Sequence, residues 1–140
     1  MNTTPLTDAE QARLREICAA IPYVQLLGIE LLEAERGAAR LRLPVSEKLT
    51  RMQGIMHGGA IASLIDSASA FAVITLLEAG QTTVTVDLTL HYLRPVLRGA
   101  ITAHARVLRA GRRIVIIAVD VTNDEGELTA TALTTYTKTS

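Results

Sequence analysis

Residues 58–77 of this 140-residue chain read GGAIASLIDSASAFAVITLL, and this stretch is the strongest indication of its architecture. It is rich in Ala, Ile and Leu and carries one charge, on Asp66. A helix that is apolar on all sides lies either in a protein core or in lipid. Its length approaches that of a membrane span, but two glycines, several hydroxyl side chains and a central carboxylate favour burial within protein. We therefore predict a long, buried central helix.

Short extended segments surround this stretch. Residues 28–35 and 38–44 form a predicted hairpin, with Arg36-Gly37 as the turn signal. After the helix, a four-strand meander is predicted over residues 82–92, 99–109, 113–122 and 128–137. Such segregation of helices and strands is typical of an α+β fold with a largely antiparallel sheet. We expect this sheet to wrap around the central helix.

Apolar and polar residues alternate most clearly in residues 82–92. Successive side chains of a strand point to opposite faces. The alternation therefore predicts one apolar face, made of Val84, Val86, Leu88, Leu90 and Tyr92. The opposite, polar face would consist of Thr85, Asp87, Thr89 and His91.

The chain begins with a predicted short helix. Thr7 followed by Glu10 is a capping-box pattern, and the apolar stripe behind it, which includes Cys18, ends before Pro22. The first five residues lack the charged and apolar regions of an export signal, which favours a cytoplasmic location. We predict one domain over residues 1–140: an N-terminal helix (1–21), a central helix with its preceding loop (54–78) and the meander (82–137).

Composition excludes several classes of partner. The chain has 14 basic and 14 acidic residues and no Trp, whereas a protein that binds nucleic acid needs a basic excess or stacking aromatics. One cysteine permits no intrachain disulfide and no thiolate cluster. Three scattered histidines do not build a metal site. We expect no nucleic-acid partner, no membrane association, no metal and no resident cofactor.

The chemical signal is concentrated at the beginning of the central helix. His57, Gly58 and Gly59 precede it, and two glycines there let a ligand approach the unpaired amides of the helix N-terminus. These amides can serve as an oxyanion hole. Asp66 follows eight residues after Gly58, and no Lys or Arg occupies its helical neighbour positions. A buried carboxylate without a partner is costly and indicates a function.

Structural roles remain open for each of these residues. The two glycines could form only a tight turn, His57 could be a hydrogen-bonded structural residue, and Asp66 could pair with a distant arginine or face water. Helix geometry adds a constraint, because eight residues separate Gly58 and Asp66 by about 12 Å along one axis. One chain cannot bring both to the same carbonyl group, but two antiparallel copies can. A catalytic site built from these residues therefore requires at least a dimer.

At these residues the chain resembles the hotdog-fold acyl-CoA thioesterases, especially the PaaI-like branch that includes phenylacetyl-CoA and 4-hydroxybenzoyl-CoA thioesterases. The resemblance covers nearly the whole chain. It includes residues 22–29, the motif Gly54-x-x-His57-Gly58-Gly59 with Asp66, Val86-Asp87-Leu88, residues 92–95 and the turn at residues 123–126.

The resemblance implies a hotdog fold: a curved antiparallel sheet wrapped around the central helix, paired into homodimers and often homotetramers. It implies that Asp66 acts as nucleophile or general base and that the Gly58 N–H polarises the thioester carbonyl. It also implies that His57 orients the substrate and that Thr85 holds the hydrolytic water. Gly59 is a further expected substrate contact.

One position departs from the family pattern. Asn or Gln is common six residues before the histidine, where this chain has Arg51, and Gln53 is offset by two. Because an arginine cannot accept a hydrogen bond, the substrate contacts of Arg51 and Gln53 are left open.

The sequence predicts an acyl-CoA thioesterase, with the coenzyme A thioester as substrate. Arg94, Arg98, Arg112 and Arg113 could meet the coenzyme A phosphates, or could be ordinary solvated charges. The alternatives are a hydratase or dehydratase on the same fold, for which the sequence has no characteristic histidine motif, and a non-catalytic acyl-CoA binding or sensing module.

Overall fold

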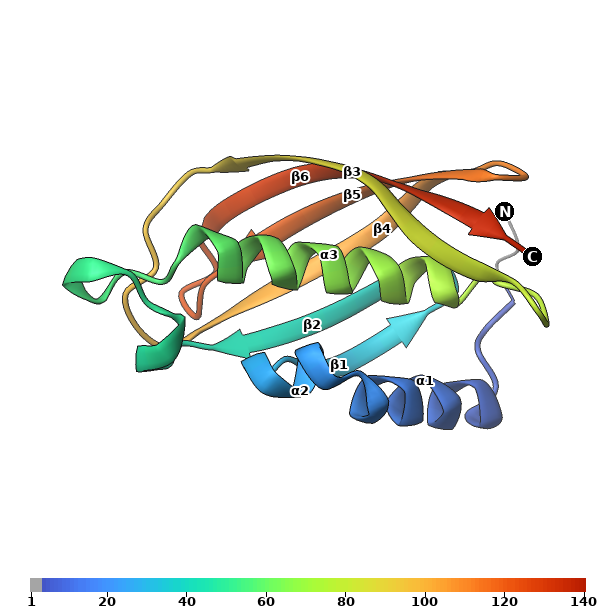
Figure 1. Cartoon of the computed structure of the whole chain (residues 1–140), viewed down its shortest axis with the longest axis horizontal. Coiled ribbons are helices and arrows are strands. Elements are labelled where there is room, and N and C mark those ends of the chain that lie inside the picture. The colour runs from blue at the N-terminus through green and yellow to red at the C-terminus, as the bar shows by residue number, and fades with distance from the viewer. Residues whose placement is uncertain (1–3) are drawn as a thin grey trace.

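The computed structural model describes residues 4–140, which form one sheet, a long central helix and two N-terminal helices. Helix α3 (Gly58–Ile74) runs along the inner face of a curved six-stranded sheet (Figure 1). Every neighbouring pair of strands is antiparallel. The predicted α+β architecture, with the sheet wrapped around a central helix, is confirmed.

The six strands agree closely with the predicted segments. They are β1 (Glu30–Glu35), β2 (Ala38–Pro44), β3 (Thr82–Tyr92), β4 (Ala100–Ala110), β5 (Ile114–Thr122) and β6 (Leu128–Thr139). Their order in the sheet is β1-β2-β4-β5-β6-β3. The predicted four-strand meander is therefore wrong, because only β4, β5 and β6 follow one another. β2 and β5 occupy both sides of β4, which leaves β6 as the partner of β3.

Two helices precede the sheet. α1 (Asp8–Ala20) begins with the expected capping box, in which Thr7 Oγ1 accepts from the Glu10 N–H and the Glu10 carboxylate accepts from the Thr7 N–H. α2 (Pro22–Leu27) was not predicted. Its first residue is proline, which cannot continue α1 but suits the first position of a new helix.

The connection from β2 into α3 is structured. It contains two 3₁₀ turns, η1 (Glu47–Leu49) and η2 (Met52–Gly54). At the other end, α3 stops at Ile74 because the Thr75 hydroxyl bonds back to the Ala72 carbonyl and accepts the Gly37 N–H. No helix of residues 4–140 is both long enough and apolar enough to cross a bilayer.

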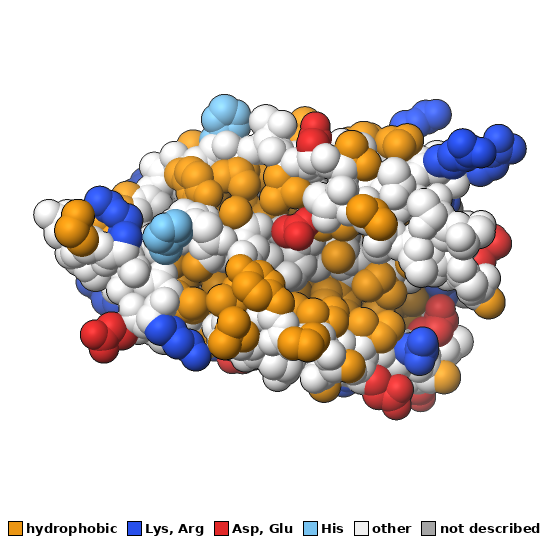
Figure 2. All heavy atoms as spheres, viewed as in Figure 1, with side chains coloured by type: hydrophobic (Ala, Val, Ile, Leu, Met, Phe, Trp, Pro, Cys, Tyr) orange, Lys and Arg blue, Asp and Glu red, His pale blue; other side chains and the backbone are white. Residues whose placement is uncertain are grey.

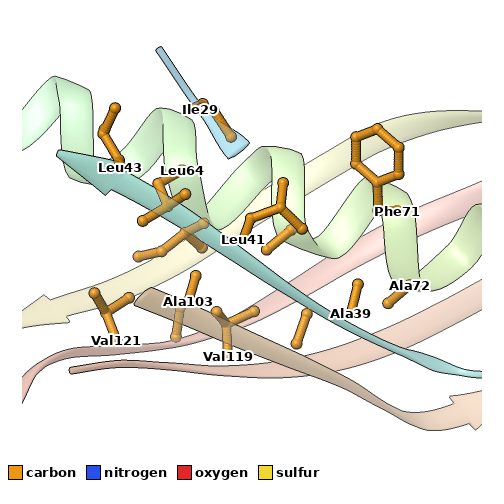
Figure 3. Close-up of a cluster of buried hydrophobic side chains, with 14 of the residues drawn as sticks. Ile29, Ala39, Leu41, Leu43, Leu64, Phe71, Ala72, Ala103, Val119 and Val121 are labelled. Carbon is orange, nitrogen blue, oxygen red and sulfur yellow. The ribbon is translucent and has the colours of Figure 1, made fainter. Parts of the chain in front are cut away.

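The core lies between α3 and the sheet (Figure 3). Leu64 from α3, Leu41 from β2 and Val119 from β5 have no exposed surface. Burying such side chains contributes about 1.5–3 kcal/mol each relative to leaving them in water. Cys18 on α1 is also buried, and burial raises the pKa of its thiol.

Strand β3 contains a β-bulge that changes which residues face the helix. Thr85 pairs with Tyr136, and Asp87 pairs with Thr135, so Val86 is the extra residue. An extra residue reverses the alternation on one side of the bulge. Val86 and Val84 are therefore exposed, at 56% and 59%, although they were predicted to share a face with the half-buried residues Leu88 and Leu90. The polar-side placement of Thr85 is wrong for the same reason.

Candidate active site

Asp66 is a half-buried carboxylate at the middle of α3, held by two hydroxyl groups. Thr85 donates from its Oγ1 to Asp66 Oδ1 over 2.9 Å. The Tyr136 hydroxyl makes a short hydrogen bond to the same Oδ1 and lies 2.6 Å from the Asp66 carbonyl oxygen. No Lys or Arg in residues 4–140 forms an ion pair with Asp66. The alternative of a distant arginine partner is therefore excluded within this part of the chain.

The two oxygens of the carboxylate differ in their surroundings. Oδ1 accepts both hydroxyl groups, whereas Oδ2 has no hydrogen-bond partner among the described residues. The arrangement fixes the orientation of the carboxylate and leaves Oδ2 available for chemistry.

Tyr136 is a site residue that sequence reasoning missed. It lies on β6 with 2% of its surface exposed. Burial, and then the neighbouring Asp66 carboxylate, raise the pKa of the Tyr136 phenol, so the hydroxyl keeps its proton and remains a donor. The buried residues Ala130, Ala132 and Thr134 precede it at two-residue spacing. This spacing could have placed Tyr136 on the buried face of the strand. A buried tyrosine hydroxyl requires a hydrogen-bond partner, so Tyr136 could then have been considered as a site residue.

The first turn of α3 offers one free amide. The Gly59 N–H donates to His57 Nδ1 over 2.8 Å, and the Ala60 N–H donates to the His57 carbonyl over 2.9 Å. For the Gly58 N–H there is no acceptor within residues 4–140. Helix N-termini attract anions and carbonyl oxygens through such amides. Of the two glycines, Gly58 is therefore the one that can bind a ligand through its N–H.

His57 is the N-cap of α3. Its Nδ1 is occupied as an acceptor, so a neutral ring carries its proton on Nε2, and the side chain is exposed. A structural role as cap is thus established by geometry. The His57 Nε2–H is exposed, one residue before the free Gly58 amide, and can serve the expected role in orienting substrate.

Tyr92 fixes the peptide of Gly58 from the end of β3. The Tyr92 hydroxyl donates to the Gly58 carbonyl over 2.7 Å. A Cβ atom at position 58 would lie 3.2 Å from the Tyr92 ring, closer than ordinary packing. Glycine at this position therefore permits the close approach of Tyr92, a contact that the sequence did not reveal.

Gly58 and Asp66 both belong to α3, eight residues apart. The rise of an α-helix places them about 12 Å apart along the axis. Within one chain they cannot meet at a single carbonyl group. The geometric argument for a second copy therefore holds on the observed helix.

The remaining predicted contacts lie at the approach to α3 or on the surface. Arg51 and Gln53 are exposed beside η2, and Gln53 has a left-handed backbone (φ 69°).

The arginines considered for the coenzyme A phosphates lie on the surface. Arg94 forms an exposed ion pair with Glu127 over 3.2 Å, and Arg98 forms one with Glu125 over 3.9 Å. Arg112 and Arg113 lie at the β4–β5 turn. Within residues 4–140 no group of three His, Cys, Asp or Glu side chains is placed to hold a metal.

A space-filling view shows hydrophobic side chains gathered on the face of the molecule where α3 lies (Figure 2). Exposed apolar residues on the elements around this face include Tyr23, Leu26, Val84, Val86 and Tyr92. Contiguous apolar surface of this kind marks binding sites or interfaces.

A family model described as the thioesterase superfamily matches residues 53–130, which include His57, Gly58, Asp66 and Thr85. The chain belongs to the thioesterase superfamily. The human acyl-coenzyme A thioesterase 13 is 32% identical to it over 124 residues, 86% of each chain. A thioesterase structure from Haemophilus influenzae has a TM-score of 0.86 at 27% identity and covers 98% of this chain and 93% of its own.

The hotdog fold and its PaaI-like form are seen in a third comparison. The PaaI protein of E. coli, from the phenylacetic acid degradation operon, superposes with a TM-score of 0.85 at 22% identity. It covers 94% of this chain and 93% of its own. This likeness confirms the fold expected from the sequence, and the family model and the human relative confirm the thioesterase family.

Proposed function

We propose that this thioesterase hydrolyses acyl-CoA to a free acid and coenzyme A at a site shared by two chains. The observation that carries the proposal is the pair of unused groups on α3. The Gly58 N–H has no acceptor and Asp66 Oδ2 has no donor within residues 4–140. Two antiparallel copies of α3 would bring the amide of one chain to the carboxylate of the other.

The chemistry follows from these two groups. The Gly58 N–H binds the thioester carbonyl oxygen and stabilises the negative charge that develops on it. Asp66 Oδ2 of the partner chain either attacks the carbonyl carbon or removes a proton from the water that attacks. If Asp66 attacks, the C–S bond breaks as the coenzyme A thiolate leaves, and water then hydrolyses the mixed anhydride between the acyl group and Asp66, which frees the carboxylate. If Asp66 acts as base, the water oxygen becomes part of the acid as the C–S bond breaks, and the proton taken by Asp66 passes to the departing thiolate.

Relatives support the choice of thioester. Acyl-coenzyme A thioesterase 13 is named for coenzyme A thioesters and matches most of this chain. The candidate contacts near the entry to the site are His57, Gly59, Arg51 and Gln53. Thr85 orients the carboxylate of Asp66, because its hydroxyl donates a hydrogen bond to Asp66 Oδ1.

The unpaired edge of β3 is the surface through which the chains would pair. β3 is the last strand in the sheet order, and an exposed apolar edge strand is a template for strand pairing. Val84 and Val86, both more than half exposed, lie on this strand. Antiparallel pairing of two β3 edges would place two α3 helices on the same side of one continuous sheet. We propose a homodimer of this kind as the active unit.

The decisive test is release of free thiol from a panel of acyl-CoA substrates by the wild-type protein and by Asp66→Asn. The variant should fold normally and lose about a hundredfold or more in kcat, the scale of removing a positioned acid–base group. Asp8→Asn makes the same change on an exposed residue of α1, outside the proposed site and interface, and should retain activity.

Two outcomes would contradict the proposal. Near-normal turnover by Asp66→Asn would remove Asp66 from the mechanism. Binding of acyl-CoA by the wild-type protein without thiol release from any substrate would favour the sensing module.

A further inference from the structure

A hollow of about 540 Å³ lies between α1, the end of α3 and the beginning of β3. The apolar side chains that line it are all aliphatic. One side is formed by α1 and the residues before it, and the other by the end of α3 and the residues after it. The larger of these side chains are Leu6, Leu14 and Ile17 on the first side and Ile74 and Leu77 on the second. Charged residues, among them Arg13 and Glu78, line the same hollow and are exposed. Figure 2 shows hydrophobic side chains around a depression on this face.

Strand β3 contacts both Asp66 and this hollow. Thr85 donates to Asp66, and Thr83, two residues earlier on the same face of β3, lines the hollow. Two residues of a strand cover about 7 Å. Both threonines are half-buried on the side that faces α3.

Helix α3 leads in the same direction. Asp66, Ala70 and Ile74 follow one another at four-residue spacing, which places them along one side of the helix. Ile74 lines the hollow, and eight residues of helix separate it from Asp66 by about 12 Å along the axis. The two elements that hold the carboxylate therefore both continue into the hollow.

We propose that this hollow binds the acyl chain of the substrate, and that the substrate class is linear aliphatic acyl thioesters of medium or long chain. The inference rests on the proposed function, because it takes the reacting carbonyl to lie at Asp66. From there a linear chain can follow α3 and β3 into the hollow. A short acyl group would end before reaching it. The aliphatic lining provides no aromatic ring on which an aryl group could stack.

The proposal predicts how activity depends on chain length. Each methylene group buried in the hollow should multiply kcat/KM by a factor of at most about four, which corresponds to the usual free energy of burying a methylene. We therefore expect kcat/KM to rise from butyryl-CoA through octanoyl-CoA to longer chains, and to rise little or not at all for phenylacetyl-CoA relative to butyryl-CoA.

Ile17→Trp tests the location of the acyl chain, because the larger side chain fills the hollow. The ratio of kcat/KM for dodecanoyl-CoA to that for butyryl-CoA should fall by about tenfold or more, the loss of two or more buried methylenes. Leu108→Trp is the matched control, since Leu108 is 56% exposed on β4 and does not line the hollow. It should leave the ratio unchanged.

Ala79→Trp provides a second variant in case Ile17→Trp does not fold. Ala79 lines the hollow but is exposed, so a tryptophan there does not disturb the core. A wild-type protein that hydrolyses acyl-CoA without preference for long chains, or variants with unchanged ratios, would overturn the inference and leave the proposed function intact. Absence of hydrolysis with every substrate would instead overturn the proposed function.

Discussion

At the scale of single residues, the main feature is a carboxylate held by hydroxyl groups instead of a cation. Thr85 and Tyr136 both donate to Asp66 Oδ1. These hydroxyl groups orient the carboxylate without placing a positive charge beside it. The raised pKa of Tyr136 ensures that this donor does not ionise in the neutral range. Tyr136 is thus a positioning residue for the proposed chemistry.

Replacing Tyr136 with Phe removes one of the two donors. A hydrogen bond to a charged group contributes about 1.5–3 kcal/mol, so we expect kcat to fall by about tenfold to a hundredfold while KM changes little. Thr85→Val should have a related effect. Because both hydroxyl groups serve one oxygen, the double variant should deviate from additivity, and steady-state kinetics of all four proteins would measure this coupling.

Thr134→Val is the structural control for this series. Thr134 is buried two residues from Tyr136 on β6 but donates to Ser69, not to Asp66. Its replacement should lower the melting temperature without lowering kcat. If Tyr136→Phe behaved in the same way, the positioning role would be wrong.

At the scale of secondary-structure elements, Arg36 joins α1, the β1–β2 turn and the end of α3. Its side chain is only 13% exposed. The guanidinium donates to both carboxylate oxygens of Glu10, over 3.0 and 3.1 Å, and to the Thr75 carbonyl over 3.2 Å. It also reaches the carbonyls of Thr4 and Pro5. This cluster fixes α1 over the hollow that we assign to the acyl chain.

The pH dependence of stability should reveal this contact. Hydrogen bonds from Arg36 and from the Thr7 amide lower the pKa of Glu10 from 4.5 to about 2. Above about pH 4.5 the Glu10 carboxyl is ionised in both the folded and the unfolded protein, so its full contribution to stability is present. As pH falls from 4.5 to 2, the unfolded state gains the proton first and the stabilisation is lost.

Glu10→Gln should therefore lower the melting temperature at pH 7 but have a diminishing effect as pH approaches 2. Thermal unfolding followed by circular dichroism at several pH values measures the difference. Glu16→Gln, at an exposed position of the same helix, is the matched control. An equal difference between Glu10→Gln and wild type at pH 7 and at pH 2.5 would contradict this account.

At the scale of the whole molecule, one chain contains both groups that we propose to react, but it holds them too far apart to act on one carbonyl group. The eight-residue separation of Gly58 and Asp66 on a straight helix prevents it. Activity would therefore depend on assembly. The exposed edge of β3, with Val84 and Val86, is the surface on which that assembly should depend.

Val86→Lys should separate the chains. A lysine on an edge strand opposes pairing with a second strand, and Val86 is exposed in the single chain, so its replacement should not disturb the core. Light scattering coupled to size-exclusion chromatography should show a dimer for the wild type and a monomer for the variant, which should also lose thiol release.

Leu108→Lys is the control for this experiment, because it introduces the same charge at a similarly exposed apolar position away from the β3 edge. A monomeric Val86→Lys that retained full activity would show that the site is not shared. Activity of the wild-type protein as a monomer would also show that the site is not shared between two chains.

Most helices and strands, together with Asp66 and the amides at the start of α3, could be predicted from local sequence patterns. The apolar stretch of residues 58–77, the alternation in the strands and the capping box at Thr7 are local patterns, and local patterns follow from helix and strand geometry. Asp66 was recognisable because a lone charge in an apolar helix is costly. The amides of Gly58 and Gly59 were recognisable as a helix N-terminus.

The way in which distant segments meet could not be predicted from the sequence. The position of β3 beside β6, the bulge at Val86 and the hydrogen bond from Tyr136 to Asp66 all join residues far apart in the chain. Strand order and register depend on which edges remain free after the other strands have paired, and a two-residue period carries no information about that choice. A single extra residue in β3 turned Thr85 toward the carboxylate, which the alternation of the sequence alone had placed on the opposite face.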